Sequence, residues 1–313
     1  MAADVKIVPQ APSLSPSPWD IALGLAFVSD YNFRGITQSN HKPSVWAYFE
    51  PRYNITKDLQ LYAGIGGESI AFPNGAAAEI DLSAGIRPTL GPVALDLGVW
   101  YYWYPGGECF HNLGAFGADC AANGALPINA NTVKANLNFL EIFAKSTFTL
   151  NEGVAFGVAM YYSPSVVNSG ANGTYVSGNL KFTAPRTLLP DGFNAYWSAE
   201  AGYWLLGTTD AFYCSQNAAG TACGGSFPNA IPYSNYANWN FGFGITKSVI
   251  TVDFRYYDSD LRRGDCNAVT SDHTARFTRD FTPTNSSGFG SNWCGQAFII
   301  AGKVDLTATA NLK

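Results

Sequence analysis

Six cysteines give this chain its most distinctive chemistry, and they occur as three neighbouring pairs. Cysteines with this spacing form either disulfides or part of a metal site. A thiolate metal site is disfavoured because no Cys-x-x-Cys spacing occurs. We therefore predict three local disulfides, no metal centre and an oxidising compartment. The predicted bonds are Cys109–Cys120, Cys214–Cys223 and Cys266–Cys294.

Catalytic chemistry finds little support among the other residues. The three histidines are His41, His111 and His273, and they lie far apart in the sequence. No Gly-x-Ser-x-Gly motif occurs, so a positioned nucleophile and base are not evident. The acidic run at Asp258, Asp260 and Asp265 lacks the later glutamate of an EF-hand, which favours a solvated charge cluster. We predict that the protein is not an enzyme and binds no cofactor.

The composition restricts which elements can carry these residues. Of the 313 residues, 47% are hydrophobic, 15% are aromatic and only 13% are charged. The mean hydropathy of -0.01 shows that apolar residues are dispersed, whereas a membrane helix needs a run of about 18 or more. The aromatic content argues against disorder. The net charge of -5 argues against a nucleic-acid partner. An all-β fold remains.

Apolar and polar residues alternate with a period of two along many segments, which is typical of strands with two different faces. From Val93 to Trp103, for example, the odd positions are all apolar or aromatic and the even ones include Asp96 and Gly98. This rule predicts twelve strands, at 19–29, 44–55, 59–67, 79–87, 92–104, 134–149, 153–163, 174–184, 193–206, 236–247, 249–258 and 296–312.

The connections between these strands alternate between short and long. Short periplasmic turns at one end, long extracellular loops at the other and an even strand number are typical of a transmembrane antiparallel β-barrel in a bacterial outer membrane. We predict a barrel over residues 19–313 and a Pro/Ser-rich periplasmic segment over 1–18. Both termini are then periplasmic, and a precursor with a signal peptide is expected.

Several motifs point to a known family. The segment VSDYNFRGITQS at 28–39 resembles the opening signature of the TorF-type family of bacterial porins. EIDLSAG at 79–85, DLGVWYYWYPG at 96–106 and LEIFA at 140–144 resemble the same family in the same order. The resemblance implies an outer-membrane β-barrel with a pore function.

Charged residues on the polar strand faces are the candidates for lining the barrel. Buried charges must be paired or hydrated, so this set either cross-links opposite walls or lines a wet channel. Glu50 with Arg52, and Asp253 with Arg255, are two positions apart and favour local ion pairs. The pore-lining candidates are Arg34, Glu50, Arg52, Arg87, Asp96, Glu141, Lys145, Lys181, Glu200, Asp253, Arg255 and Lys303.

Arg34 occupies the most family-like stretch, just beyond the first predicted strand. If that strand continues past Ser29, the guanidinium points into the barrel mouth, where carboxylates such as Asp30 or Asp96 are possible partners. The alternative is an exposed loop arginine.

The sequence favours a porin-like channel for passive diffusion of ions or small solutes. Twelve tilted strands give a free bore under about 10 Å once side chains are counted. A net negative interior predicts a mild preference for cations. The alternative is a closed structural or binding barrel with disulfide-braced surface loops. Expected partners are membrane lipid and lipopolysaccharide. The arginines at 262, 263, 276 and 279 either contact lipopolysaccharide phosphates or fold inward as a constriction. The sequence does not determine the oligomeric state.

Overall fold

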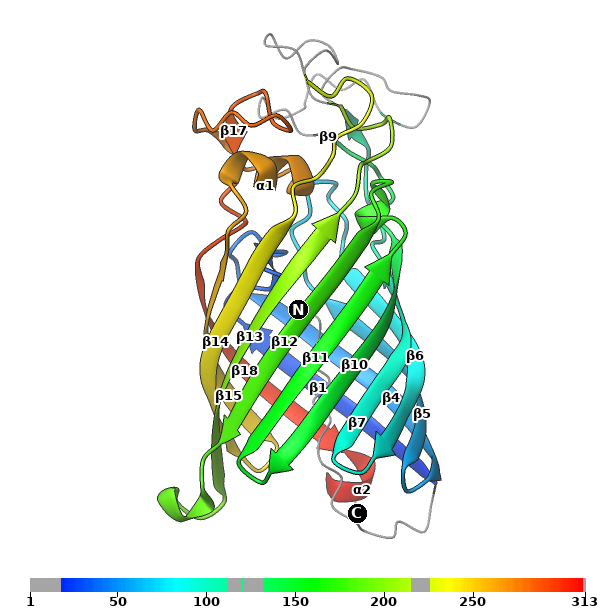
Figure 1. Ribbon diagram of the computed structural model, residues 1–313, viewed down its shortest axis with the longest axis vertical. Helices are drawn as coiled ribbons and strands as arrows, with labels where there is room; N and C mark the ends of the chain where they lie inside the picture. The colour runs from blue at the N-terminus through cyan, green and yellow to red at the C-terminus, as the bar shows by residue number, and fades with distance from the viewer. Residues whose placement is uncertain (1–17, 112–119, 121–131, 215–225, 312–313) are drawn as a thin grey trace.

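The computed structural model describes residues 18–111, 120, 132–214 and 226–311. Twelve antiparallel strands form a closed barrel, as predicted (Figure 1). Its strands are β1 (Trp19–Val28), β4 (Ser44–Thr56), β5 (Leu59–Glu68), β6 (Glu79–Leu90), β7 (Val93–Trp103), β10 (Phe139–Asn151), β11 (Val154–Ser163), β12 (Gly173–Thr183), β13 (Phe193–Leu206), β14 (Tyr236–Lys247), β15 (Ile250–Ser259) and β18 (Ala297–Thr307).

Each barrel strand pairs with its neighbour along the chain, and β1 closes the wall by pairing with both β4 and β18. Short turns and the C-terminal helix α2 (Ala308–Asn311) lie at one end of the barrel (Figure 1). The long loops at the other end carry three small two-stranded sheets and the helix α1 (Arg263–Thr270). These sheets pair β2 (Asn32–Phe33) with β3 (Ile36–Thr37), β8 (Phe110–His111) with β9 (Thr132–Val133), and β16 (Arg276–Phe277) with β17 (Phe289–Gly290).

Two predicted strands were too long. The one expected at 134–149 begins only at Phe139, because asparagine side chains occupy the backbone groups before it. Asn74 Nδ2 donates to the Ala135 carbonyl at 2.9 Å, and the Asn138 N–H donates to Asn136 Oδ1 at 2.8 Å. The last strand, expected to reach residue 312, ends at Thr307. There the Asn311 side chain accepts the Thr307 N–H at 2.8 Å and α2 begins.

The outer face of the wall is apolar on every strand. Large hydrophobic side chains point outward and are exposed, from Phe27 on β1 to Phe298 on β18. Exposed aromatic residues such as Trp19 and Trp103 lie near the strand ends, as interfacial girdles do. This band faces lipid, and the protein is a transmembrane barrel of the bacterial outer membrane. No helix among the described residues is long and apolar enough to cross a membrane.

The barrel interior divides into two zones. Toward the long loops, a continuous cluster of buried apolar side chains includes the β2–β3 hairpin and residues from most strands of the wall, such as Trp46, Phe143 and Ile299. Toward the short turns, charged side chains such as Glu50 and Arg87 replace the apolar ones. We call the apolar zone toward the long loops the outer zone and the charged zone toward the short turns the inner zone. The outer zone resembles the packed core of a small barrel more than a channel.

Candidate functional site

The site is centred on Arg34, whose side chain lies inside the barrel and is almost fully buried. Its Nη1 and Nη2 donate to Glu141 Oε1 and Oε2 at 2.8 and 2.9 Å, a two-pronged ion pair with the β10 wall. Tyr102 adds a hydroxyl hydrogen bond to Glu141 Oε2 at 3.1 Å. Arg34 is thus inside the barrel mouth, but its partner is Glu141 and not Asp30 or Asp96.

Aromatic rings surround the Arg34 guanidinium. The Arg34 Cζ atom lies 4.3 to 4.8 Å from the centroids of four rings. Such contacts stabilise a desolvated cation through the negative ring faces. The rings are those of Phe33 in the hairpin, Tyr161 on β11, Tyr175 on β12 and Trp204 on β13. Arg34 therefore ties the hairpin to one side of the wall.

A tight turn, and not a continued strand, delivers Arg34 to this position. β1 ends at Val28, and the chain then forms the β2–β3 hairpin with Arg34 and Gly35 at its tip. Both have positive φ, at 50° and 82°, which is the pattern of a two-residue type I′ turn. Asn32 Oδ1 accepts the Gly35 N–H at 3.0 Å and stabilises the turn. The first strand does not continue past Ser29, so the condition under which the sequence placed Arg34 in the barrel mouth is not met, although Arg34 does lie there.

Hydrogen bonds from the last loop hold the base of the hairpin. Thr37 N–H donates to the Trp293 carbonyl at 2.8 Å. His41 lies between the Asp30 carboxylate and the Asn292 carbonyl, 2.8 Å from each. Because neither acceptor can donate a proton when Asp30 is ionised, both ring nitrogens must carry one, and the His41 imidazolium is the species that fits. The hydrogen bond to Asp30 raises the pKa of His41 above its ordinary value.

The charges of the inner zone form two separate networks, and both predicted local pairs are present. Arg52 Nε donates to Glu50 Oε1 at 2.6 Å. Arg87 donates to both Glu50 oxygens, at 2.7 and 3.0 Å, and its Nε lies 3.4 Å from Asp96 Oδ2. This network therefore joins β4, β6 and β7 on one side of the barrel interior.

The second network lies on β13, β14 and β15. Arg255 Nε bonds Asp253 Oδ1 at 3.1 Å, and Tyr196 donates to Asp253 Oδ2 at 2.6 Å. Four further predicted residues lie on inward strand positions and are half-buried: Lys145, Lys181, Glu200 and Lys303. Lys145 Nζ is 4.5 Å from the Phe143 ring centroid and Lys181 Nζ is 4.7 Å from that of Tyr196. A pore-lining role for the predicted set stays a prediction.

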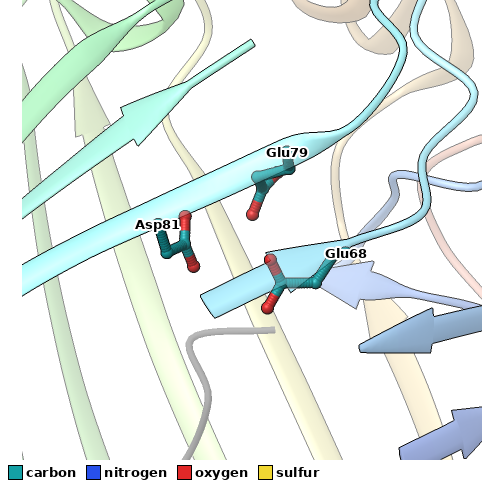
Figure 2. Close-up of side chains that lie close together, drawn as sticks. All are labelled: Glu68, Glu79 and Asp81. Atoms are coloured by element: carbon teal, nitrogen blue, oxygen red, sulfur yellow. The ribbon is translucent and has the colours of Figure 1, made fainter. Parts of the chain in front are cut away.

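A third cluster of polar residues was not among the predicted sites. Glu68, Glu79 and Asp81 point toward one another at the outer ends of β5 and β6 (Figure 2). One oxygen from each lies within 4.8 Å of the others, and all three residues are buried. Glu68 and Glu79 are direct cross-strand partners. The sequence contained a signal for the Glu68–Glu79 pair. Glu68 begins the connection predicted between the strands at 59–67 and 79–87, and Glu79 directly follows that connection.

A cavity of about 80 Å³ lies above the hairpin, beneath the long loops. Its walls are mainly aromatic and apolar, including Phe72, Tyr104 and Trp293, and Glu79 contributes a carboxylate. Small-molecule sites commonly combine such walls with a few polar groups.

Two of the predicted disulfides are present, at Cys109–Cys120 and Cys266–Cys294. Cys214 is also disulfide-bonded, and its predicted partner Cys223 lies outside the described residues. Residues 1–17 of the predicted periplasmic segment lie outside them as well. In the last loop, the exposed Arg262 pairs with Asp280. Contact with lipopolysaccharide stays a prediction.

Comparisons with known proteins give a family match and distant structural likenesses. Residues 13–116 match the model of a family described as a bacterial protein of unknown function, Gcw_chp. The match does not confirm the resemblance to the TorF-type family, which stays a prediction. No curated protein matches the chain.

Three solved structures illustrate the structural likeness. An outer membrane channel from Pseudomonas putida F1 is 10% identical, with a TM-score of 0.43 over 96% of this chain and 100% of that one. The NanC porin is 8% identical, with a TM-score of 0.39 over 92% and 98%. LpxR from Salmonella typhimurium is 9% identical, with a TM-score of 0.39 over 91% and 99%. These values are too low to transfer a function, so the chain is similar in its N-terminal part to the Gcw_chp family and its activity must be inferred from its own site.

Proposed function

We propose that the protein is a closed outer-membrane barrel that presents a disulfide-braced binding surface on the cell exterior. The ion pair of Arg34 with Glu141 carries this proposal, because it fixes the β2–β3 hairpin inside the barrel. Around the pair, buried side chains leave little room for a water path through the outer zone. The cavity above the hairpin is the natural place for a ligand.

A passive pore, mildly selective for cations, is the second candidate. It is favoured by the inner zone, where the Arg52, Arg87 and Arg255 side chains keep 10 to 14% of their surface exposed. Water therefore reaches these networks. Conduction through the whole barrel requires the hairpin to leave its position.

Planar-bilayer conductance of the refolded full chain separates the two functions. The wild-type protein should show no steady conductance. A variant in which a short Asn-Gly turn replaces residues 30–42 removes the hairpin, and it should conduct. The barrel should tolerate this change because Val28 and Ser44 are already paired across the gap.

A turn shortened at the opposite end is the matched control. Removing residues 186–188, the short 3-10 helix η2 (Arg186–Leu188), should leave the barrel closed. Steady conductance of the wild-type protein would instead favour the pore. A hairpin-free variant that stays closed would show that other groups block the interior.

A further inference from the structure

Glu68, Glu79 and Asp81 form a compact carboxylate cluster at the outer end of the β5–β6 pair (Figure 2). The cluster arises from strand pairing. Glu68 is the last residue of β5 and faces Glu79, the first residue of β6, while Asp81 lies two residues on along the same inward face. Like charges placed directly opposite destabilise a strand pair, so this arrangement calls for a compensating group.

Among the described residues, no lysine, arginine or histidine forms an ion pair with these three carboxylates, whose residues are only 6%, 2% and 4% exposed. Three carboxylates at this distance cannot all be ionised without a cation or bound protons. Tyr31 donates a hydroxyl hydrogen bond to Glu79 Oε1 at 2.6 Å, but its neutral group supplies no charge.

Glu68 supplies an independent sign of a missing partner. Its Oε2 is shielded from solvent and has no hydrogen-bond partner among the residues that the structure describes, and the same holds for Asp81 Oδ1. Buried acceptors are nearly always satisfied, so such orphans need a specific explanation. Both side chains point into the cluster (Figure 2).

We propose that Glu68, Glu79 and Asp81 bind a hard divalent cation, with calcium as the best fit. Calcium takes oxygen ligands at about 2.3–2.6 Å, so two of its ligands lie at most about 5 Å apart. The spacing of 4.8 Å or less meets this limit. The outer cavity reaches Glu79 and provides a path for the ion and for water ligands. The bound ion joins β5 to β6 and, through Tyr31, to the chain that leads into the hairpin.

Isothermal titration calorimetry with CaCl2 on the refolded, EDTA-treated full chain tests this site. The wild-type protein should bind calcium, and its thermal midpoint should rise with calcium concentration, since a ligand stabilises the state that binds it. Glu68→Gln and Asp81→Asn each remove one charged ligand and should weaken binding about tenfold or more, because affinity follows the ligand charge count. Without calcium, Glu68→Gln should fold at least as stably as the wild-type protein, since repulsion is relieved.

Asp253→Asn is the matched control, a barrel-interior carboxylate already neutralised by Arg255. It should lose stability yet keep the full response to calcium. The proposal is overturned if the wild-type protein neither binds calcium nor is stabilised by it, or if Glu68→Gln and Asp81→Asn respond as the wild-type protein does. These outcomes do not depend on whether the barrel conducts, so the site and the proposed function are tested separately.

Discussion

Arg34 and Glu141 are 107 positions apart in the chain, yet their side chains form a two-pronged ion pair that is 3% and 1% exposed. The pair joins an inward loop to the opposite wall of the barrel. Because both charges are desolvated, the removal of one leaves the other uncompensated, and the cost is much larger than for a surface pair.

We expect Arg34→Ala to reduce the free energy of unfolding by roughly 3–5 kcal/mol, measured by urea unfolding of the detergent-folded protein. Adding Glu141→Gln should recover part of that loss, because it removes the orphaned charge. Arg34→Lys should restore only part of the wild-type stability, since a lysine ammonium cannot form the bidentate hydrogen bonds that the planar guanidinium makes with a carboxylate. Additive effects of Arg34→Ala and Glu141→Gln would show that the two side chains do not interact.

Gly35→Ala tests the close approach of the hairpin tip to the wall. A Cβ at this position would lie 2.9 Å from the Cβ atoms of Asn238 and Ser259, on a backbone with φ of +82°. Gly91 is the matched control, with φ of +62° and nothing within 4 Å of its added Cβ. We expect Gly91→Ala to lose about 1–2 kcal/mol from backbone strain alone. Gly35→Ala should lose a further 1–3 kcal/mol from overpacking. Equal losses would mean that the hairpin tip is free to move.

His41 makes stability depend on pH. Its pKa is raised, first by the hydrogen bond to Asp30 and then by that to the Asn292 carbonyl. The stabilisation is therefore fully present below the ordinary histidine pKa of about 6.5 and is lost as pH rises through the folded-state value. Thermal unfolding between pH 5.5 and 8.5 should show a loss of roughly 1 kcal/mol, given partial exposure. In His41→Gln this pH-dependent loss should vanish, and an unchanged profile would assign it to another group.

The Cys266–Cys294 disulfide should stabilise the hairpin indirectly. Ile36 forms a β-bridge with Cys294, so the bonded loop supports β3. The double variant Cys266→Ser, Cys294→Ser should lose about 2–4 kcal/mol. Amide exchange at Thr37, which donates to the Trp293 carbonyl, should accelerate in the same variant. Cys109→Ser with Cys120→Ser is the control and should leave exchange at Thr37 unchanged. Similar acceleration in both variants would point to a general loosening of the loops.

The wall of the barrel could be predicted from sequence because its determinants are local. Alternation of period two marks both faces of a strand, and the Glu50–Arg52 pair follows directly from that spacing. The start of β10 was missed because it depends on a distant partner, and the end of β18 because the Asn311 side chain, four residues on, accepts the Thr307 N–H. The segment before Phe139 is occupied by side chains such as Asn74, which alternation does not reveal.

The position of Arg34 could not be predicted in the same way. The alternation of inward and outward side chains along β1 does not extend past Val28, where the strand ends, so it cannot predict where the Arg34 side chain points. The type I′ turn at Arg34 and Gly35 then reverses the direction of the chain. Which carboxylate pairs with Arg34 depends on how far the β2–β3 hairpin extends across the barrel interior, and this distance cannot be read from the sequence. Glu68 and Glu79 match no metal-binding motif in the sequence, because they become neighbours only when β5 pairs with β6.

Closure of the wall between β1 and β18 imposes an order on assembly. Until β18 has docked, β1 and β15 each present a row of unpaired backbone groups, which a bilayer cannot satisfy. The backbone groups at the edge of β1 are therefore satisfied only after the last strand, β18, has paired with it. The bridge from Ile36 to Cys294 spans this same seam, because Ile36 follows β1 and Cys294 precedes β18. The inward hairpin consequently makes its contact with the last loop only after β1 and β18 have come together, so it stabilises the closed barrel and not an open intermediate.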